Sequence, residues 1–281
     1  MKKHLIQTVL FMALVVVSSQ TFCQQTIKKR IDSVMDIAFR RGIFNGNVLV
    51  AKAGKVIYQA GFGFAEAGKK GKLKPETLFD IGSVSKEFNG VSIMLLKEKK
   101  LLDLDDPIAK FLPDLGDWAK RVKVRHLISY TSGIPIFDPL AMEPDSVVWR
   151  NLTGLKSLQF EPGSSYLYNH YNVYLQMRII EKASGLSYAD FIRDHIFIPL
   201  GMKDAVVDYP PDGERIAKAF DGQFRPTPYG QGMSGWVRLS AGDLYRFADA
   251  LDHFRLISGR VLQGTGLELS RRRKQPGLNW I

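Results

Sequence analysis

Residues 84 to 99 form the stretch that most constrains the fold of this chain. Apolar side chains recur there with few helix breakers, at Val84, Phe88, Val91, Ile93, Met94, Leu95 and Leu96. The pattern predicts a helix that is apolar on most sides, and such a helix is stable only when other elements cover it. The chain has 281 residues, of which 45% are hydrophobic, so it is large enough to bury this helix in a sizeable core.

The flanking segments show both helical and strand periods. Residues 27 to 41 predict an amphipathic helix, and residues 47 to 51 and 56 to 64 predict strands joined by a tight turn at Ala53-Gly54. The Gly- and Lys-rich residues 65 to 76 predict a loop. Helical patterns return in three later segments, namely residues 171 to 183, 188 to 195 and 241 to 253. Together these elements predict one α/β (α+β) unit with a mostly helical insertion.

The two ends of the chain differ from its centre. Lys2 and Lys3 precede a 13-residue apolar run from Leu5 to Val17, a pattern typical of a secretory signal peptide and too short to span a bilayer. We therefore expect a signal peptide over residues 1–23, a domain over 24–259 and a basic tail over 260–281. The domain is expected to be secreted or periplasmic, with no stable membrane span after signal cleavage.

The composition disfavours several other classes. Cys23 is the only cysteine, and the five histidines show no paired ligand spacing, so no disulfide framework, metal site or cofactor is expected. The net charge of +11 is concentrated partly in Lys2, Lys3 and the five basic residues after residue 259. Between the two ends no basic stripe alternates with aromatic residues. Nucleic-acid binding is therefore not predicted.

The stretch FDIGSVSK, residues 79 to 86, carries a candidate nucleophile. Residues i and i+3 share a helix face, so Ser83 and Lys86 can touch, whereas the residue three after Ser85 is Phe88. A serine hydroxyl needs a neighbouring base, and burial can make a lysine amine neutral enough to serve. The plainer interpretation is that Ser83 caps a helix and Lys86 is solvated, because an S-x-x-K tetrapeptide arises about once by chance in a chain of this size.

A wider resemblance favours the catalytic interpretation. The chain resembles the serine β-lactamase and penicillin-binding family, nearest its class C β-lactamase and D-alanyl-D-alanine carboxypeptidase branch. The agreeing stretches run in order from Gly46 to Ala205: GNVLVAKAGKVIYQAGFGFAE, FDIGSVSK, LLDLDDPIAKFLPDL, VRHLISYTSGIP, FEPGSSYLYNHYN and FIPLGMKDA. The resemblance implies a β-lactamase/transpeptidase-like fold, an antiparallel sheet flanked by helices, with Ser83 as the nucleophile and Lys86 as its partner.

The resemblance also implies roles for residues near Tyr168. The Phe-x-Pro-Gly lead-in places Tyr168 at the tyrosine of the family's Tyr-x-Asn element, where the phenol shares proton transfer with the lysine; an ordinary core tyrosine is the alternative. The family's asparagine falls on His170. Either His170 binds substrate with altered specificity, or Asn169 or Asn172 beside it reaches in, or His170 is simply a hydrogen-bonded loop residue.

The third family element is not found. No Lys/His-Ser/Thr-Gly tripeptide follows Tyr168, and the nearest stretches, residues 233 to 235 and 264 to 266, lack the cation. The last stretch stops resembling the family, so we expect a truncated or out-of-frame end that lacks the C-terminal strands. An α/β-hydrolase is disfavoured because no G-x-S-x-G occurs.

These observations predict a secreted serine hydrolase that forms an acyl-enzyme on Ser83. Its substrate would be a small-molecule or peptidoglycan-peptide amide or ester, such as a β-lactam, a D-Ala-D-Ala peptide or a small ester. Two alternatives stay open: a non-catalytic binding or sensing domain that keeps the pocket, and an inactive fragment. The sequence indicates no oligomeric state.

Overall fold

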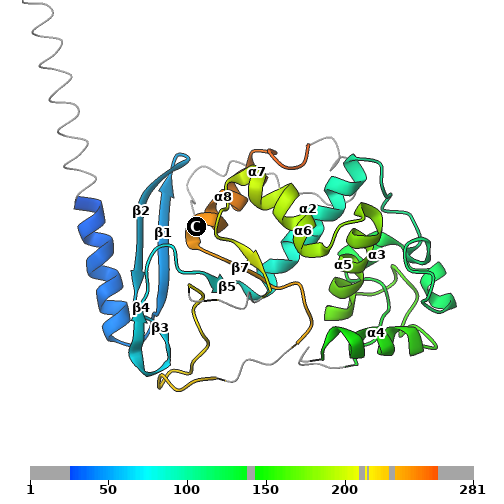
Figure 1. Ribbon diagram of the computed structural model, residues 1–281, viewed down its shortest axis with the longest axis horizontal. Coiled ribbons are helices and arrows are strands. Elements are labelled where there is room, and N and C mark those ends of the chain that lie inside the picture. The colour runs from blue at the N-terminus through cyan, green and yellow to red at the C-terminus, as the bar shows by residue number, and fades with distance from the viewer. Residues whose placement is uncertain (1–25, 138–142, 209–212, 214, 228–231, 259–281) are drawn as a thin grey trace, which may run out of the picture. The chain divides into compact units, whose positions relative to one another are not determined.

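The computed structural model of the chain describes residues 26–137, 143–208, 213, 215–227 and 232–258 (Figure 1). The segments predicted as signal peptide and basic tail, 1–23 and 260–281, lie outside the described residues. The described chain forms two compact units. The first comprises the described residues of Met1–Phe79, Glu214–Pro228 and Ser240–Tyr245, and the second those of Asp80–Gly213, Tyr229–Leu239 and Arg246–Ile281.

The first unit contains the predicted hairpin. A helix over residues 26–40 precedes β1 (Gly46–Lys52) and β2 (Lys55–Phe62), which pair antiparallel. The turn between them is Ala53-Gly54, and both residues have positive φ, at 50° and 74°. Two positive φ values at the centre of a two-residue loop match the right-handed twist of the paired strands.

The segment predicted as a loop, residues 65 to 76, contains a second small hairpin. β3 (Phe64–Glu66) and β4 (Lys70–Lys72) pair antiparallel around the single turn η1 (Ala67–Lys69). The prediction was wrong here because β4 is the exposed tripeptide Lys-Gly-Lys, which shows none of the apolar alternation that marks a half-buried strand.

The second unit is built around the apolar helix. The helix α2 (Ser85–Glu98) follows a 3-10 turn, η2 (Gly82–Val84), and its Phe88, Ile93 and Leu96 are completely buried. It packs against α5 (His170–Ser184), and the ring of Phe88 stacks on Phe247 with centroids 4.0 Å apart. The burial predicted from the pattern of residues 84 to 99 is confirmed.

Short elements complete the second unit. Its helical segments are η3 (Ile108–Lys110), η4 (Asp117–Lys120), α3 (Val124–Ile128), α4 (Asp145–Gly154), α6 (Tyr188–Ile192), the π-helical η5 (Arg193–Phe197) and α7 (Ile198–Leu200). Its strands β6 (Val206–Val207) and β7 (Val237–Leu239) pair antiparallel. Two elements, β5 (Phe79–Asp80) and α8 (Ala241–Asp252), cross the boundary between the units, and the sheet order is β5-β7-β6.

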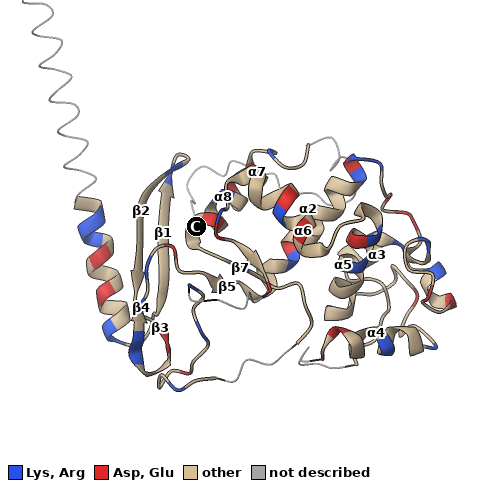
Figure 2. Ribbon diagram, in the orientation of Figure 1, with Lys and Arg blue, Asp and Glu red and all other residues tan. Residues whose placement is uncertain are grey.

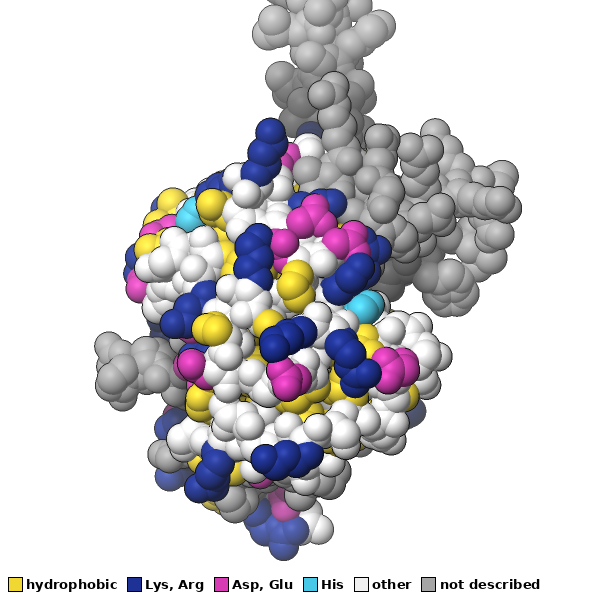
Figure 3. Space-filling view, turned by 90° about the vertical axis from the view of Figure 1, so that its right-hand side faces the viewer, with side chains coloured by type: hydrophobic (Ala, Val, Ile, Leu, Met, Phe, Trp, Pro, Cys, Tyr) yellow, Lys and Arg dark blue, Asp and Glu magenta, His cyan; other side chains and the backbone are white. Residues whose placement is uncertain are grey.

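Charged side chains of both signs are distributed along the described chain (Figure 2). On the face shown in Figure 3, basic and acidic side chains alternate, with small apolar areas between them. None of the helices within the described ranges has the length and apolar character needed to cross a bilayer.

Candidate active site

Three predicted residues meet in the second unit. The Nζ of Lys86 donates a hydrogen bond to the Oγ of Ser83 at 3.1 Å, and the phenolic oxygen of Tyr168 lies 3.0 Å from the same Oγ. Ser83 is exposed, Lys86 is half-buried and Tyr168 is 40% exposed. A serine hydroxyl with two proton-exchanging groups in hydrogen-bond contact has the geometry of an activated nucleophile.

Ser83 lies in η2, one residue before the cap of α2, rather than inside the α-helix. Gly82 adopts φ 51°, a left-handed conformation that glycine reaches without steric cost, and its N–H donates to Asp80 Oδ1 at 2.8 Å. Two residues after Ser83, the Oγ of buried Ser85 accepts a hydrogen bond from the N–H of Val237 in β7 at 3.0 Å. The turn is therefore anchored at Gly82 and at Ser85, the positions that flank Ser83 and Val84.

A buried ion pair supports the same turn. Arg238 is only 1% exposed, and its guanidinium lies 3.0 Å from Asp80 Oδ2. Since Asp80 also accepts the N–H of Gly82, one carboxylate connects β7 to the turn that carries Ser83. A buried guanidinium that lost its carboxylate would be costly, so this contact fixes the register between β7 and the turn.

The environment of Tyr168 favours its ionised form. Burial raises the pKa of the phenol, but hydrogen bonds with Ser83 and Lys86 and the charge of Lys86 outweigh burial, so the pKa lies below the ordinary value of 10.0. The ring of Tyr130 lies 4.9 Å from that of Tyr168, and burial raises the pKa of Tyr130. The pKa values of these two neighbouring phenols are therefore shifted in opposite directions.

Two aromatic rings lie near the side-chain nitrogen of Lys86. Its Nζ lies 5.4 Å from the ring centre of Tyr168 and 4.9 Å from that of Trp236. Both distances fall within the range of cation–π attraction. The ring of His170 lies 6.1 Å from each of these two rings. The side chains of Tyr168, His170 and Trp236 therefore form one aromatic cluster next to Lys86.

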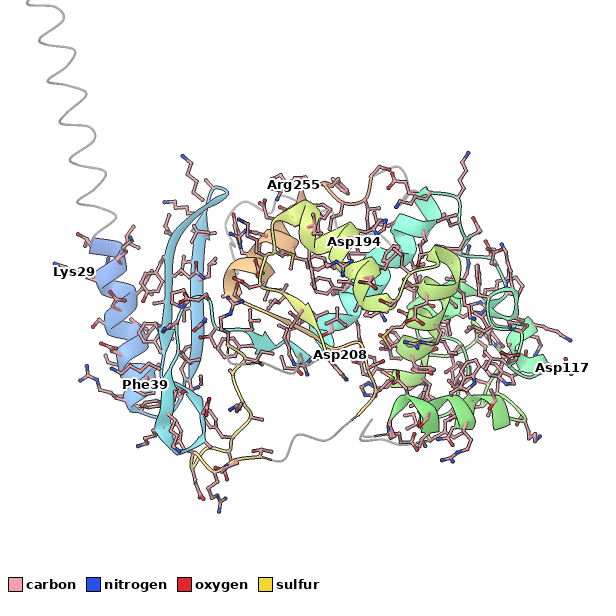
Figure 4. The ribbon with its side chains drawn as sticks, viewed as in Figure 1. Lys29, Phe39, Asp117, Asp194, Asp208 and Arg255 are labelled. Atoms are coloured by element: carbon pink, nitrogen blue, oxygen red, sulfur yellow. The ribbon has the colours of Figure 1, made fainter. Side chains whose placement is uncertain are left out.

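Asp208 and Asp145 hold the segment that carries Trp236. Asp208 Oδ1 accepts the N–H groups of Gly235 at 2.7 Å and Trp236 at 3.2 Å, and Asp145 accepts both the N–H and the hydroxyl of Ser234. Asp208, labelled in Figure 4 just after β6, has φ 59°, a strained value for a residue other than glycine. Burial raises its pKa, although the two N–H donors oppose this.

The three candidate substrate-binding residues lie in different surroundings. Asn169 is 2% exposed and caps α5, accepting from the N–H of Asn172 at 3.1 Å and donating to the carbonyl of Ile134 at 2.8 Å. Asn172 is fully buried and donates its side-chain amide to Asn169. His170, by contrast, has its side chain beside the rings of Tyr168 and Trp236.

Sequence reasoning missed five residues of this arrangement, namely Asp80, Asp145, Asp208, Trp236 and Arg238. Asp80 is separated from Arg238 by 158 positions, so no local pattern connects them. Only Asp80 carried a local signal, because a carboxylate two residues before a glycine commonly accepts its N–H in a turn. Across the described ranges, no three His, Cys, Asp or Glu side chains converge to hold a metal ion.

Comparisons with known proteins identify the family of this chain. A family model described as beta-lactamase matches residues 24–280. Penicillin-binding protein 4* of Bacillus subtilis (strain 168) is 36% identical over 194 residues, which are 66% of this chain and 42% of that protein. The putative penicillin-binding protein PbpX of the same strain is 29% identical over 76% of this chain and 56% of its own length. The chain thus spans about half the length of these relatives.

Two solved structures of related proteins have a fold similar to that of this chain. The octameric penicillin-binding protein homologue from Pyrococcus abyssi superposes with a TM-score of 0.68 at 26% identity, over 83% of this chain and 58% of that one. A class C beta-lactamase superposes with a TM-score of 0.71 at 24% identity, over 86% of this chain and 69% of that one. At that identity the second likeness concerns the fold alone.

Proposed function

Since this chain belongs to the beta-lactamase family, which includes serine β-lactamases and penicillin-binding proteins, we propose that it is a serine hydrolase acting through an acyl-enzyme on Ser83. Its fold is the β-lactamase/transpeptidase-like fold, with helices and antiparallel strands. The observation that carries the proposal is the contact of Ser83 Oγ with both Lys86 Nζ and the phenolic oxygen of Tyr168.

The first half of the reaction follows from this contact. Tyr168, with its lowered pKa, takes the proton of Ser83 while Oγ attacks the substrate carbonyl carbon. The N–H of Ser83 donates to the oxyanion that develops in the tetrahedral intermediate. When the carbonyl bond to nitrogen or to the ester oxygen breaks, the leaving group takes a proton from Tyr168, and the acyl group stays on Ser83.

Water completes the cycle. Tyr168 accepts a proton from a water molecule that attacks the acyl carbon, and the proton returns to Ser83 as the acid product leaves. Lys86 stays close to both oxygens and stabilises negative charge on the phenolate throughout.

The proposed substrates are a β-lactam, a D-Ala-D-Ala peptide or a small ester. The names of the B. subtilis relatives, penicillin-binding proteins, support the first of these classes. His170 is proposed to contact the substrate, because it stands at the position of the family's asparagine and its ring lies beside Tyr168 and Trp236. We place the protein outside the cytoplasm, as a secreted or periplasmic enzyme.

A labelling experiment tests the proposal. The purified protein is incubated with a fluorescent penicillin and, in parallel, with a fluorophosphonate probe, and covalent labelling is read on denaturing gels. We expect labelling that disappears in Ser83→Ala and persists in Ser165→Ala, which removes an exposed serine near Tyr168. A cooperative heat melt of each sample shows that it is folded.

The second candidate function is that of a binding domain that keeps the pocket without turnover. It is favoured by the histidine at position 170, where the family has an asparagine. A folded sample that binds penicillin reversibly, with no covalent adduct from either probe, would favour this function over the hydrolase. An unfolded sample would favour the inactive fragment.

A further inference from the structure

The positive charge of the described chain is concentrated in its first unit. The described residues of that unit carry 14 lysines and arginines against 6 aspartates and glutamates, whereas those of the second unit carry 18 of each. The proposed hydrolase uses residues of the second unit only, so it does not account for this excess. A net charge confined to one part of a molecule attracts that part to a surface of opposite charge.

The densest basic segment is the small hairpin of β3 and β4. Four lysines fall within six residues there, at positions 69, 70, 72 and 74, and all four are exposed. Successive residues of a strand point to opposite faces, and Leu73, between the last two lysines, is buried. Lys70, Lys72 and Lys74 therefore project together from the outer face of β4 and the residues that follow it.

The charge of these four lysines is not compensated nearby. Among the described residues none of the four forms an ion pair, and Glu66 on the opposite strand is paired with Lys218 at 3.3 Å. The Nζ of Lys69 lies 5.3 Å from the ring centre of Phe224, within the range of cation–π attraction. Such a contact orients the exposed ammonium without neutralising it.

An exposed apolar side chain lies next to the hairpin. The helix over residues 26–40 ends beside β3, because Phe39 packs on Phe64 with ring centroids 6.0 Å apart, and Asn45 exchanges two hydrogen bonds with the backbone of Phe64. Between these contacts Ile43 is 74% exposed, and Arg41 is exposed as well. Figure 2 shows basic segments both at the end of this helix and along β4. This end of the unit thus presents basic and apolar side chains together.

Protection of an open strand edge explains part of this pattern. Within the described residues β4 pairs only with β3, and charged side chains on an open edge prevent pairing with another chain. That role accounts for Lys70 and Lys72, which lie in β4 itself. It accounts neither for Lys69 and Lys74, which lie outside the strand, nor for the exposed Ile43.

We propose that the basic end of the first unit, defined by Arg41, Ile43, Lys69, Lys70, Lys72 and Lys74, binds the surface of an anionic phospholipid bilayer. The basic side chains attract the negatively charged headgroups, and Ile43 enters the boundary between headgroups and acyl chains. The exposed isoleucine favours a bilayer over a soluble polyanion, because a soluble polyanion offers no apolar phase. This surface is separate from the hydrolase site and does not depend on its activity.

Vesicle binding tests the role of charge. The purified full chain is mixed with vesicles of phosphatidylcholine alone or of phosphatidylcholine with phosphatidylglycerol, and the bound fraction is measured by co-sedimentation. The apolar run from Leu5 to Val17 can enter either bilayer, so the quantity compared is the ratio of the two affinities. We expect the natural protein to prefer the anionic vesicles, and salt to weaken this preference.

Two triple variants with the same loss of charge are then compared. One carries Lys70→Gln, Lys72→Gln and Lys74→Gln, and the control carries Lys156→Gln, Lys182→Gln and Lys203→Gln at three exposed positions of the second unit. Each basic residue near an anionic surface contributes about 5-fold to affinity, so the ratio should fall about 100-fold in the first variant and less than about 3-fold in the control. A cooperative heat melt shows that each variant is folded. Equal losses in the two variants, or no preference of the natural protein for anionic vesicles, would overturn the proposal.

A dye at position 43 distinguishes a bilayer from a soluble polyanion. In a Cys23→Ser background, Ile43→Cys or, as the control, Lys156→Cys is labelled with a polarity-sensitive fluorophore. We expect a blue shift at position 43 with anionic vesicles, none there with inorganic polyphosphate, and none at position 156 with either. No shift at position 43 on the vesicles, or an equal shift at position 156, would overturn the proposal.

The hydrolase and the membrane surface can fail separately. Ser83→Ala should bind anionic vesicles as tightly as the natural protein, because Ser83 lies in the second unit. A protein that is not labelled by penicillin but keeps the vesicle preference would support the membrane surface without the hydrolase. A protein that is labelled on Ser83 but shows no vesicle preference would overturn the membrane surface and leave the hydrolase intact.

Discussion

The backbone N–H of Trp236 donates to Asp208 Oδ1 at 3.2 Å, and the indole that this bond positions lies 4.9 Å from the Lys86 ammonium. The same Asp208 oxygen accepts the N–H of Gly235 at 2.7 Å, where a Cβ would overlap the sulfur of Met177. Asp208, which is half-buried and has a strained φ, thus fixes the loop that carries the Trp236 ring. Residues with strained φ values of this kind persist where the surrounding structure determines them.

Substitutions at Asp208 should separate its hydrogen bonds from its charge. Asp208→Ala removes the acceptor of two buried N–H groups and should lower the free energy of unfolding by about 1 to 3 kcal/mol. Asp208→Asn keeps an acceptor and tolerates positive φ. Urea titration measures both variants, and equal losses for Ala and Asn would contradict the assigned role.

The charge of Asp208 should appear in the pH dependence of stability. Burial raises the pKa of the folded-state carboxyl above its unfolded value of 3.8, so its contribution to stability is full below the unfolded pKa and is lost as the pH rises through the folded pKa. Asp208→Asn should therefore be at least as stable as the natural protein at pH 7, and the difference should vanish toward pH 3.5. A difference that grows on acidification would have the wrong sign.

Tyr168→Phe should remove the proton acceptor while leaving the fold intact. Tyr168 is 40% exposed and its hydroxyl bonds to Ser83, so the phenyl ring can keep its packing against Tyr130. We expect the rate of Ser83 acylation to fall by about 10² to 10⁴, the usual contribution of a general base. Stopped-flow labelling with a fluorescent penicillin measures the rate, and a loss of less than about 3-fold would assign the base to another group.

The lowered pKa of Tyr168 gives a direct titration test. Hydrogen bonds with Ser83 and Lys86 and the Lys86 charge keep the pKa of the phenol below 10.0 against the effect of burial. Replacing Lys86 by Met should therefore move the Tyr168 midpoint to higher pH, whereas replacing the exposed Lys120 by Met should not. NMR of Cζ-labelled tyrosines, assigned with Tyr168→Phe, follows the midpoint without requiring activity. An unchanged midpoint in Lys86→Met would contradict the electrostatic coupling.

The buried pair of Asp80 and Arg238 should behave as one unit. Arg238→Met alone leaves the Asp80 carboxylate without its guanidinium and should cost about 3 to 5 kcal/mol of unfolding free energy. The double variant Asp80→Asn with Arg238→Met leaves no uncompensated charge and should lose less than the sum of the single variants. Denaturant titration of all four proteins gives the coupling, and strict additivity would show that the pair acts through separate contacts.

Much of the second unit could be predicted because its determinants are local. The apolar surface of residues 84 to 99 required a buried helix, and the spacing of Ser83 and Lys86 predicted a contact that the structure shows at 3.1 Å. The spacing did not reveal that Ser83 lies in a 3-10 turn, because that geometry depends on Gly82 and on the hydrogen bond from Val237 to Ser85.

The remaining features depend on contacts between distant residues. The ring of Trp236 reaches Lys86 only because two aspartates hold its loop, and nothing near position 236 in the sequence signals this. For the same reason the sequence left Asn169, His170 and Asn172 as equal candidates, although the helix cap made by Asn169 separates them.

Mass spectrometry of the protein after reaction with benzylpenicillin and with a fluorophosphonate tests directly whether Ser83 is the nucleophile. We expect an intact-mass increase of one whole penicillin, since ring opening loses no atoms, and, with the fluorophosphonate, a phosphonyl adduct. Peptide mapping should place both adducts on Ser83. A folded protein that carries either adduct on a different residue, or that shows neither adduct after prolonged incubation, would contradict the claim that Ser83 is the nucleophile.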